Sequence, residues 1–519
     1  MKLSKSVIFG AAACLLSTSA SAQAAGDLLA LSQYNYSFST ARSAALGGAF
    51  TSLGADLSSM SINPAGLGMY MSSDFGISPS LTWNNMQSTY LGTKSDYSRT
   101  RFTLGNLGMA FNLYQGSGTL TSFTLGVGYS KLADFNTTSA AYGQGIDKSI
   151  TDVLAEYMNG VPLSSLGHPD NDPYQPFRRA DVGLWGGILA YQTGILDPMS
   201  DAQDNKQYTV ANNLATGSRT NPSMRNVNKG SIDEYSISGG FNIQNILYLG
   251  FTIGIQDILY RNDNYYAETY DNNSLPLNGM NYIRSLHLDG TGVNFKFGAV
   301  VRPVENLRIG VAVHTPTLVS INEEYIEWMS ADYKNTARGE LLDSPRSLNE
   351  YDINTPTRLL TGISYTLPGV GLITADYERV WYNRMKLRNM GTENWDFQQT
   401  INNEDSSFYQ PANNFRVGIE ATPAQNFYIR AGYANYGECI ATRDAFNNMS
   451  SINSYENYSA GLGFRFQNMY VDLASIYTEY KYAPYTMFYY GDPDYVVNPG
   501  NVETKQSRNT ITMSVGVRF

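Results

Sequence analysis

Cysteine, histidine and positive charge are all scarce in this chain. Its 519 residues include two cysteines and three histidines, only 15% are charged, and the formal net charge is −10. With so few cysteines and histidines, the sequence shows no pattern of zinc ligands. Cys439 is the only cysteine after the first 22 residues, so an internal disulfide is excluded. The acidity argues against nucleic acid as a partner, because a protein that neutralises phosphates needs a basic face.

Motifs of enzymatic chemistry are missing as well. The sequence has no G-x-S-x-G elbow and no H-E-x-x-H pair. Its G-x-G pairs at 126/128, 143/145, 369/371 and 461/463 never gain a third glycine at dinucleotide spacing, so we interpret them as strand glycines. The sequence predicts a protein that is no enzyme and that holds neither a cofactor nor a metal ion.

Long apolar runs are also absent from most of the chain. After residue 22 no stretch of 18 residues is apolar, which excludes helical membrane spans. The apolar run at 7–16 follows Lys2 and Lys5, is too short to span a bilayer, and precedes the small residues Ala20-Ser21-Ala22. We therefore predict a cleaved signal peptide over residues 1–22, and export.

Strict strand alternation is present, and it is clearest in residues 507–519. One face of this segment carries Ile511, Met513, Val515, Val517 and Phe519, and the other carries Thr510, Thr512, Ser514, Gly516 and Arg518. A strand between lipid and a polar lumen needs this pattern. The segment is predicted to close an outer-membrane barrel and to be the part that the barrel-assembly machinery contacts.

The connections between such strands alternate short and long, as they do in bacterial barrels. Short connections lie near 115–119, 242–245, 302–305, 367–371, 422–426 and 466–469. Longer ones lie near 137–229, 262–281, 318–356, 383–412, 438–453 and 483–506, with a short outer loop near 92–98. This alternation predicts an all-β, 14-stranded antiparallel transmembrane barrel over 73–519. Its strands are expected near 73–91, 99–115, 119–136, 230–242, 245–261, 282–302, 305–317, 357–367, 370–382, 407–422, 426–437, 454–466, 469–482 and 507–519.

The long extracellular loop at 137–229 contains an unusually apolar segment at 180–193. Counting this segment as a strand would break the alternation, so we place it in the loop, folded back over the barrel mouth. Its apolar residues are candidates for capturing a ligand: Val182, Leu184, Trp185, Ile188 and Leu189. Residues 151–160 of the same loop have apolar residues at helical spacing and are predicted to form a short helix.

Residues 23–72 differ from everything that follows them. They are rich in small residues and lack the period of two. A wide barrel leaves an open channel unless something fills it, so we interpret this segment as a plug, or hatch, inside the lumen. The alternative, a disordered periplasmic arm, fits less well because the segment repeats Ala, Leu and Phe and carries few charges.

The plug also carries a family resemblance. Gly47-Gly48, the turn Gly54-Ala55-Asp56 and above all Asn63-Pro64-Ala65-Gly66 resemble the amino-terminal hatch of the FadL-type long-chain fatty-acid transporters, a family that includes TodX-type hydrocarbon channels. The resemblance implies fourteen strands, a lumenal plug and passage of a hydrophobic molecule across the outer membrane of a Gram-negative bacterium. It implies capture by outer loops, binding inside, hatch movement and lateral exit at a kink in the third strand.

Two sets of residues are candidates for these steps. Gly126 and Gly128 share a face of the third strand and mark the candidate exit, the alternative being that they make room for the plug. Inward-pointing cations could hold a carboxylate head group, the alternative being a structural role in ion pairs, since Glu420 shares a face with Arg416. These cations are Lys296, Arg308, Arg416, Arg430 and Arg465.

The expected partners are a long-chain fatty acid or hydrocarbon and the lipid of the outer membrane, with the chain itself a monomer. A competing hypothesis is that the chain is a superfamily member that serves secreted proteins as an outer-membrane scaffold or shuttle. The large loops at 137–229 and 318–356 suit both functions. An apolar, continuous lumen would favour transport, and a lumen filled by side chains would favour the scaffold.

Overall fold

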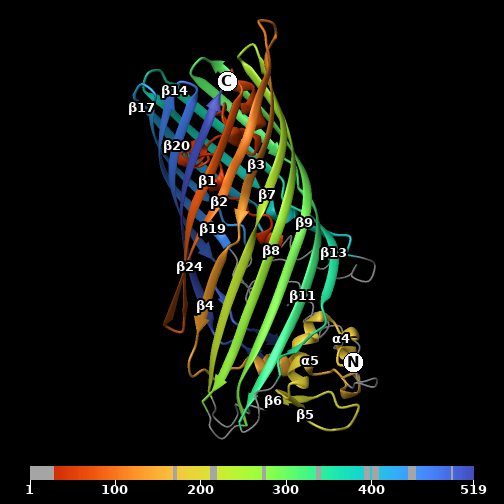
Figure 1. The fold of residues 1–519 in the computed structure, drawn as a ribbon. Helices are drawn as coiled ribbons and strands as arrows, with labels where there is room; N and C mark the ends of the chain where they lie inside the picture. The colour runs from red at the N-terminus through yellow and green to blue at the C-terminus, as the bar shows by residue number, and fades with distance from the viewer. Residues whose placement is uncertain are drawn as a thin grey trace, which may run out of the picture.

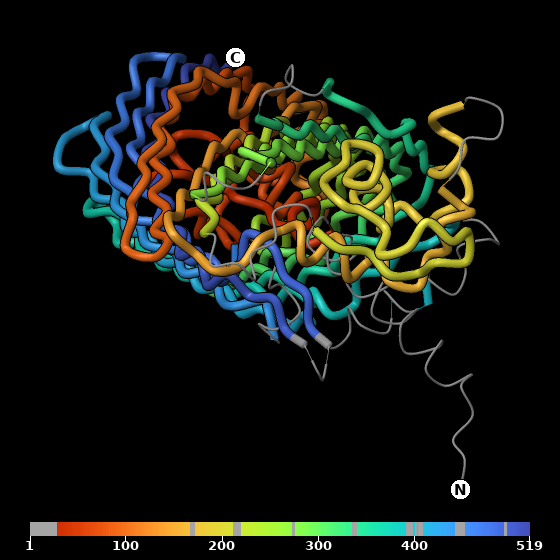
Figure 2. Tube along the Cα trace, turned by 90° about the horizontal axis from the view of Figure 1, so that it is seen from below, coloured from red at the N-terminus to blue at the C-terminus, as the bar shows by residue number. Residues whose placement is uncertain are grey.

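The computed structural model describes residues 28–166, 172–210, 219–271, 276–334, 340–390, 398–399, 402, 408–441, 452–492 and 495–519. The predicted signal peptide at 1–22 lies outside the described residues and stays a prediction. The described chain forms a closed antiparallel barrel with its amino-terminal segment inside (Figures 1 and 2). Within this part of the chain, no helix is long and apolar enough to cross a bilayer.

The barrel closes between its first and last strands. β1 (Asp74–Tyr90) pairs with β2 (Thr93–Gln115) on one side and with β24 (Asn501–Arg518) on the other. The predicted closing strand is therefore confirmed, with Phe75 opposite Val517. Counting strands that resume after a short break as one, the wall has fourteen antiparallel members, as predicted.

Between β2 and β24, consecutive wall members pair as neighbours. They are β3 (Leu120–Asp134) continued by β4 (Thr137–Tyr142), β7 (Thr220–Ile243), β8 (Leu247–Tyr270), β9 (Leu277–Val304), β10 (Leu307–His314) continued by β11 (Leu318–Tyr333), β13 (Ser347–Asn354) continued by β14 (Arg358–Leu367), β15 (Gly371–Val380) continued by β16 (Lys386–Arg388), β17 (Ala412–Ala424), β18 (Phe427–Tyr436), β19 (Ile452–Phe466) and β20 (Met469–Tyr482). Two short strands extend this sheet, β12 (Leu342–Asp343) and β21 (Tyr485–Thr486), and two more form a separate pair, β22 (Tyr490–Asp492) with β23 (Tyr495–Val497).

An apolar band surrounds the outside of the barrel. On β8, Leu249, Phe251, Ile253 and Ile255 point outward and are exposed, whereas alternate residues point inward and are mostly buried. On this strand the outward face stays apolar as far as Leu259, apart from Asp257, and ends at the exposed Arg261. A transmembrane strand needs only roughly 9–11 residues, so the band is of the length that a bilayer requires.

The strands continue far beyond this band, which the sequence did not predict. β7, β8 and β9 are 24, 24 and 28 residues long, and much of the predicted loops at 262–281 and 318–356 is strand. The predicted loop at 92–98 is also wrong, because β2 starts at Thr93 after a turn at Leu91 and Gly92. Outside the membrane both faces of a strand can be polar, so the alternation that identifies strands disappears while the ladder continues.

The long loop contains helices, confirming that residues 180–193 lie outside the wall. α3 (Ile150–Met158) confirms the predicted helix at 151–160 and begins at a capping box of Ser149 and Asp152. The remaining elements are η4 (Leu163–Ser165), α4 (Gln175–Arg178), η5 (Val182–Leu184), α5 (Trp185–Gln192) and the hairpin β5 (Leu196–Pro198) with β6 (Tyr208–Val210). We call this end of the barrel the loop end; α4 and α5 mark it in Figure 1.

The plug consists of residues 28–73 and lies within the ring of strands, where it is red in Figure 2. Its helical turns are short: η1 (Tyr36–Phe38), α2 (Ala41–Ala45), η2 (Leu57–Met60) and η3 (Pro64–Met69). Nearly all residues from 28 to 70 are buried, polar ones included. Such burial fits a plug and does not fit a free arm.

Wall glycines make room for the plug. At thirteen of them, on eleven strands, an added Cβ would lie within 3.0 Å of a plug atom, and we call this set the glycine belt: Gly76, Gly105, Gly108, Gly126, Gly128, Gly240, Gly250, Gly298, Gly310, Gly362, Gly418, Gly432 and Gly461. At Gly250 and Gly298 a Cβ would overlap Pro64 and Asn63. The plug backbone therefore packs directly against the backbone of the wall.

Substituting a belt glycine should separate plug and wall. We expect Gly298→Ala to lower the free energy of unfolding by about 1–3 kcal/mol, because the methyl group must displace Asn63. Gly118→Ala is the matched control, since nothing lies within 4 Å of a Cβ at that turn. Heat-modifiability on gels and ion conductance in planar bilayers measure the two effects. Equal melting and leak in both variants would show that the contact is not tight.

Candidate functional site

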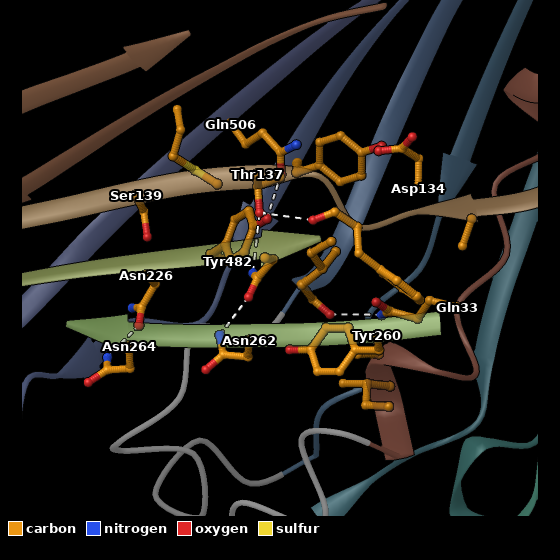
Figure 3. A pocket seen from close by; sticks show the side chains of 18 of the residues that line it. Gln33, Asp134, Thr137, Ser139, Asn226, Tyr260, Asn262, Asn264, Tyr482 and Gln506 are labelled. Carbon is orange, nitrogen blue, oxygen red and sulfur yellow. Dashed lines mark hydrogen bonds between the residues drawn. The ribbon is translucent and has the colours of Figure 1, made fainter. Parts of the chain in front are cut away.

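The candidate site is a cavity of about 180 Å³ at the loop-end side of the plug (Figure 3). The start of the plug forms one side of it, through Leu29, Gln33 and Tyr34. The rest of its lining comes from many strands, including Met86, Asp134, Thr137, Ser139, Met224, Asn226, Asn228, Tyr260, Asn262, Asn264, Arg284, Leu286, Tyr480, Tyr482, Gln506 and Arg508. The cavity thus lies where plug, wall and loop end meet.

Four asparagines form a polar strip on one wall of the cavity. Asn226 and Asn228 of β7 stand opposite Asn264 and Asn262 of β8 in the ladder. Within each pair a side-chain amide donates to the other side chain's oxygen: Asn264 to Asn226, and Asn262 to Asn228. Asn228 also donates to the Thr137 hydroxyl at 3.2 Å. We call these four residues the amide strip.

A second polar group comes from the barrel closure. Gln506 of β24 accepts a hydrogen bond from the Tyr482 hydroxyl and donates to Asn84 Oδ1 at 3.3 Å. Arg508 donates to the same Asn84 oxygen at 2.7 Å and to the Asp134 carbonyl oxygen at 3.0 Å. Its guanidinium also lies over the rings of Phe38 and Tyr480. This arginine is held on several sides.

The amide strip was missed in the sequence because all four residues fall in segments predicted as loops. Asn226 and Asn228 lie in the predicted loop at 137–229, and Asn262 and Asn264 in that at 262–281. A signal was nonetheless present: both pairs are N-x-N, the spacing that places two side chains on one face of a strand. Polar residues at a period of two can mark a strand whose inner face lines a wet cavity.

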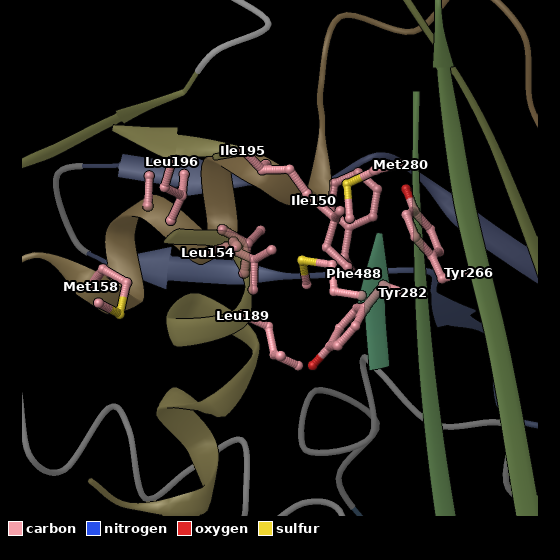
Figure 4. Packing of buried hydrophobic residues seen from close by; sticks show 14 of the residues in the cluster. Ile150, Leu154, Met158, Leu189, Ile195, Leu196, Tyr266, Met280, Tyr282 and Phe488 are labelled. Carbon is pink, nitrogen blue, oxygen red and sulfur yellow. The ribbon is translucent and has the colours of Figure 1, made fainter. Parts of the chain in front are cut away.

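The loop end is covered by an apolar cluster (Figure 4). α3 and α5 pack there against wall and loop residues such as Tyr266, Met280, Tyr282 and Phe488. Glu268 on β8 anchors the start of α3, because it accepts hydrogen bonds from the Ile150 amide at 2.8 Å and from the Ser149 hydroxyl. The helices are therefore fixed to the wall rather than hanging free.

This cluster contains most of the predicted capture residues. Trp185, Ile188 and Leu189 are buried in it, at 5%, 1% and 0% exposure, so their apolarity is explained by packing. Val182 is exposed and Leu184 is half-buried. Of the five candidates, only these two have surface that an arriving ligand could contact.

The hatch motif lies deep in the plug and shapes it. Asn63 caps η3 by accepting from the Ala65 amide at 3.1 Å, and its own amide donates to the Thr51 carbonyl oxygen at 2.6 Å. Pro64 begins η3 and packs on Gly250. Gly66 touches Leu53 and Gly54, because a Cβ there would lie within 3.0 Å of both. The motif thus ties two parts of the plug together.

Four of the five candidate cations are engaged in ion pairs. Lys296 pairs with Glu234, Arg416 with Glu378 at 3.0 Å, Arg430 with Glu420 and Asp472 at 2.6 Å each, and Arg465 with Asp472 at 3.0 Å. Arg308 has no ion-pair partner among the described residues. Glu420, expected beside Arg416, instead pairs with Arg430 and with Arg42 of the plug. This geometry supports the structural alternative for the four paired cations.

The ladder is continuous at Gly126 and Gly128. Gly126 pairs with Ala110 of β2 and with Ser238 of β7, and Gly128 with Gly108 and Ser236. A Cβ at either glycine would lie within 3.0 Å of Met60 in the plug. The alternative, room for the plug, accounts for both glycines, and an exit at this point stays an untested prediction.

The wall is interrupted nearer the loop end, between β2 and the β3–β4 strand. The β2–β3 ladder stops at Asn106 and Ser130, and residues 93–105 of β2 have no partner on this side within the described chain. β3 shifts register at Lys131 and ends at Asp134, and β4 then resumes pairing with β7. We call this interruption the seam.

Toward the loop end, the hydrogen bonds that cross the seam within the described residues come from side chains, and the cavity lies beside the seam. The Ser95 hydroxyl donates to the Ala140 carbonyl oxygen, and the hydroxyls of Tyr97 and Tyr142 are 3.1 Å apart. Asp134, Phe135, Thr137 and Ser139, which follow the broken ladder, line the cavity. The cavity and the interruption of the wall are thus next to each other.

Two solved structures have the same overall fold. The Pseudomonas putida toluene transporter TodX matches 94% of this chain and 99% of its own at 12% identity, with a TM-score of 0.51. A FadL homologue from Pseudomonas aeruginosa matches 94% and 98% at 11% identity, with a TM-score of 0.52. No protein-family model and no curated protein sequence matches the chain. The resemblance inferred from the hatch motif is thus confirmed at the level of the fold.

Removing a paired lumenal cation should destabilise the barrel. We expect Arg416→Met to lower the free energy of unfolding by about 3–5 kcal/mol, because Glu378 and Asp376 then lose a shared, fully buried partner. Arg308→Met is the control and should cost far less. Urea unfolding in detergent, followed by tryptophan fluorescence, measures the difference. Similar losses in the two variants would contradict the structural role.

Proposed function

We propose that the protein is an outer-membrane channel of a Gram-negative bacterium that takes up hydrophobic molecules, such as long-chain fatty acids, without an energy source. The observation that carries this proposal is a plugged barrel whose interior cavity lies beside a break in its own wall. Its fold is that of a toluene transporter and of a FadL homologue, which supports the same class of cargo. The proposal includes no enzymatic step and no cofactor.

The energetics of such cargo explain why a channel suffices. Each methylene group that leaves water contributes about 0.8 kcal/mol, so entry into an apolar site is downhill. The outer helices then offer a first contact through Val182 and Leu184, and the cavity offers a second site deeper inside. With successive binding sites, the molecule moves from one to the next and never has to leave a single site of very high affinity.

The seam is the exit that we propose, in place of Gly126 and Gly128. Unpaired strand edges are costly against lipid and are tolerated where they border a cavity. The cavity beside the seam meets this condition, because Thr137 and Ser139 line it from the strand that follows the break. Cargo leaving sideways at the start of the seam, where Phe102 is exposed on the outside of β2, would reach the outer rim of the apolar band and would not have to pass the plug.

Hatch movement in this scheme is confined to the start of the plug. Residues 28–35 touch no belt glycine, whereas residues from Phe38 to Gly68 do. Hydrogen bonds hold the first part instead: Gln33 donates to the Ile452 carbonyl oxygen at 2.8 Å, Arg358 donates to the Ser32 carbonyl oxygen, and the backbone amide of Asn35 donates to the Leu132 carbonyl oxygen at 2.8 Å. A small shift here would reshape the cavity and leave the Asn63–Gly66 motif in place.

A scaffold or shuttle for secreted proteins remains the second candidate. It is favoured by strands β7, β8 and β9, which project well beyond the apolar band and offer surface to a large partner. The two candidates differ in what the cavity is for. Under either function we propose two further partners, the lipid of the outer membrane and the assembly machinery, which would contact the end of β24. We also propose that the protein is a monomer.

The test of the function is the natively purified protein. We expect lipid extraction and mass spectrometry to recover long-chain amphiphiles or hydrocarbons above the level found with an unrelated barrel purified in the same way. Deletion of the gene should reduce uptake of such molecules. Recovery of no bound hydrophobe, together with normal uptake, would exclude the channel and leave the scaffold.

The test of the exit is a reversible lock across the seam. Ser95→Cys with Ala140→Cys should form a disulfide that ties β4 to β2, because the two residues already touch. We expect uptake of an oleoyl lipid to fall at least fivefold and to recover with reductant. Asn85→Cys with Ser98→Cys, a pair within the intact β1–β2 ladder, is the control. Cys439 is buried and should not interfere. Undiminished uptake through the locked seam would rule out this exit.

A further inference from the structure

Few charged side chains line the cavity. They are two cations, Arg284 and Arg508, and one carboxylate, Asp134. A second carboxylate, Glu327, lies outside the lining and accepts a hydrogen bond from the hydroxyl of Tyr325, which is part of the lining. No lysine is among the lining residues. An ionised ligand carboxylate would therefore have to bind to one of these two arginines.

Both cations already make contacts within the protein, although the Nε–H of Arg284 is buried and has no hydrogen-bond partner among the described residues. Arg508 donates hydrogen bonds to Asn84 and to the Asp134 carbonyl oxygen, and its guanidinium lies over the rings of Phe38 and Tyr480. Arg284 donates to Asn264 at 3.2 Å and lies over the ring of Tyr282. Freeing either arginine for a ligand would leave an amide oxygen or a buried carbonyl without its donor, which carries a desolvation cost.

The amide strip supplies neutral hydrogen-bonding groups instead. A carboxamide has two N–H donors and an oxygen with two lone pairs, so it can serve a hydroxyl both as donor and as acceptor. The bonds within the strip use only part of this capacity: Asn262 donates one of its two N–H groups to Asn228. Thr137 and Ser139 add hydroxyls on the neighbouring strand.

Apolar side chains complete the lining. Leu29 and Ala30 come from the plug, Met86 and Met224 from the wall, and Met487 from the loop end. Methionine is flexible and polarisable, and it suits the varied contour of an alkyl chain. The cavity therefore has a neutral polar side and an apolar side.

We propose that this cavity selects an uncharged amphiphile, whose head group carries hydroxyls or an amide and whose tail is a long alkyl chain, a monoacylglycerol being the simplest example. The inference rests on the proposed channel function and names the class of its cargo. A plain hydrocarbon leaves the spare hydrogen-bonding groups of the amide strip unused, and an ionised fatty acid would have to displace a contact of Arg284 or Arg508. A neutral polar head group does neither.

Three ligands with an eighteen-carbon chain test this selection: 1-monooleoylglycerol, oleate and 9-octadecene. Their dissociation constants are measured with the full-length mature protein in nanodiscs, at pH 8, by displacement of a fluorescent alkyl probe. We expect monooleoylglycerol to bind at least tenfold more tightly than each of the other two. Oleate binding as tightly as the glycerol ester, or more tightly, would overturn the selection while leaving the channel intact. Binding of none of the three would contradict the channel itself.

Variants of the amide strip locate the effect. Asn228→Leu with Asn262→Leu preserves side-chain size and removes hydrogen bonding from one pair, so the preference should fall below threefold while octadecene binding stays unchanged. Asn85→Leu, an exposed outward position on β1, is the matched control and should keep the full preference. The single variant Asn262→Ala serves if the double variant loses heat-modifiability. A preference that survives both strip variants would place the selection elsewhere and refute the site.

Discussion

Direct contact between the plug backbone and the wall backbone is the constraint on which this structure depends. A fourteen-stranded barrel is wide, and filling it with ordinary side chains from both partners would need a much larger plug. The glycine belt removes side chains from the wall where the two meet, so short turns such as η3 can reach Gly250 and Gly298. Glycine costs conformational entropy in a strand, and the close packing gained at the belt offsets that cost.

The lumenal charges follow from the same closeness. With water excluded, a lone cation inside the barrel is costly, so most of the lumenal cations pair with carboxylates, and two of these carboxylates also join the plug to the wall. Asp376 on β15 accepts from the backbone amides of Phe50 and Thr51 at 2.8 Å each, and it lies 3.9 Å from Arg416. Glu420 similarly joins Arg42 of the plug to Arg430 of the wall. The ion pairs and hydrogen bonds between plug and wall therefore favour the same position of the plug as the packing against the glycine belt does.

The transmembrane part of the fold could be predicted because lipid imposes a rule on sequence. Leu249 to Ile255 and Ile511 to Phe519 alternate because one face of each strand meets hydrocarbon. Beyond the apolar band lipid imposes no such pattern, so the sequence did not predict that β8 continues to Tyr270 or that β24 begins at Asn501. The plug was predictable from the lack of alternation and from Asn63-Pro64-Ala65-Gly66, but the belt was not, because a glycine's neighbour in space leaves no trace in a single sequence.

The sequence did not predict the candidate site, because its residues meet only through contacts that a single sequence does not reveal. Asn226 and Asn264 are 38 residues apart and meet only through the register of β7 and β8, which is set by the hairpin turn at Gln244 and Asn245. The lumenal cations were predictable as inward-facing, yet their partners were not.

A tightly packed plug and an interrupted wall are compatible because the plug concerns the route along the barrel axis and the interruption concerns the lateral route through the wall. In the mechanism that we propose, the belt closes the axis of the barrel to water and ions, and the plug stays in place over most of its length. A hydrophobic molecule does not need the axis, since its destination can be the bilayer itself. The seam lies where the ladder can be interrupted at least cost, next to a cavity that already contains polar groups. In this proposal, opening sideways would preserve the seal that opening along the axis would destroy.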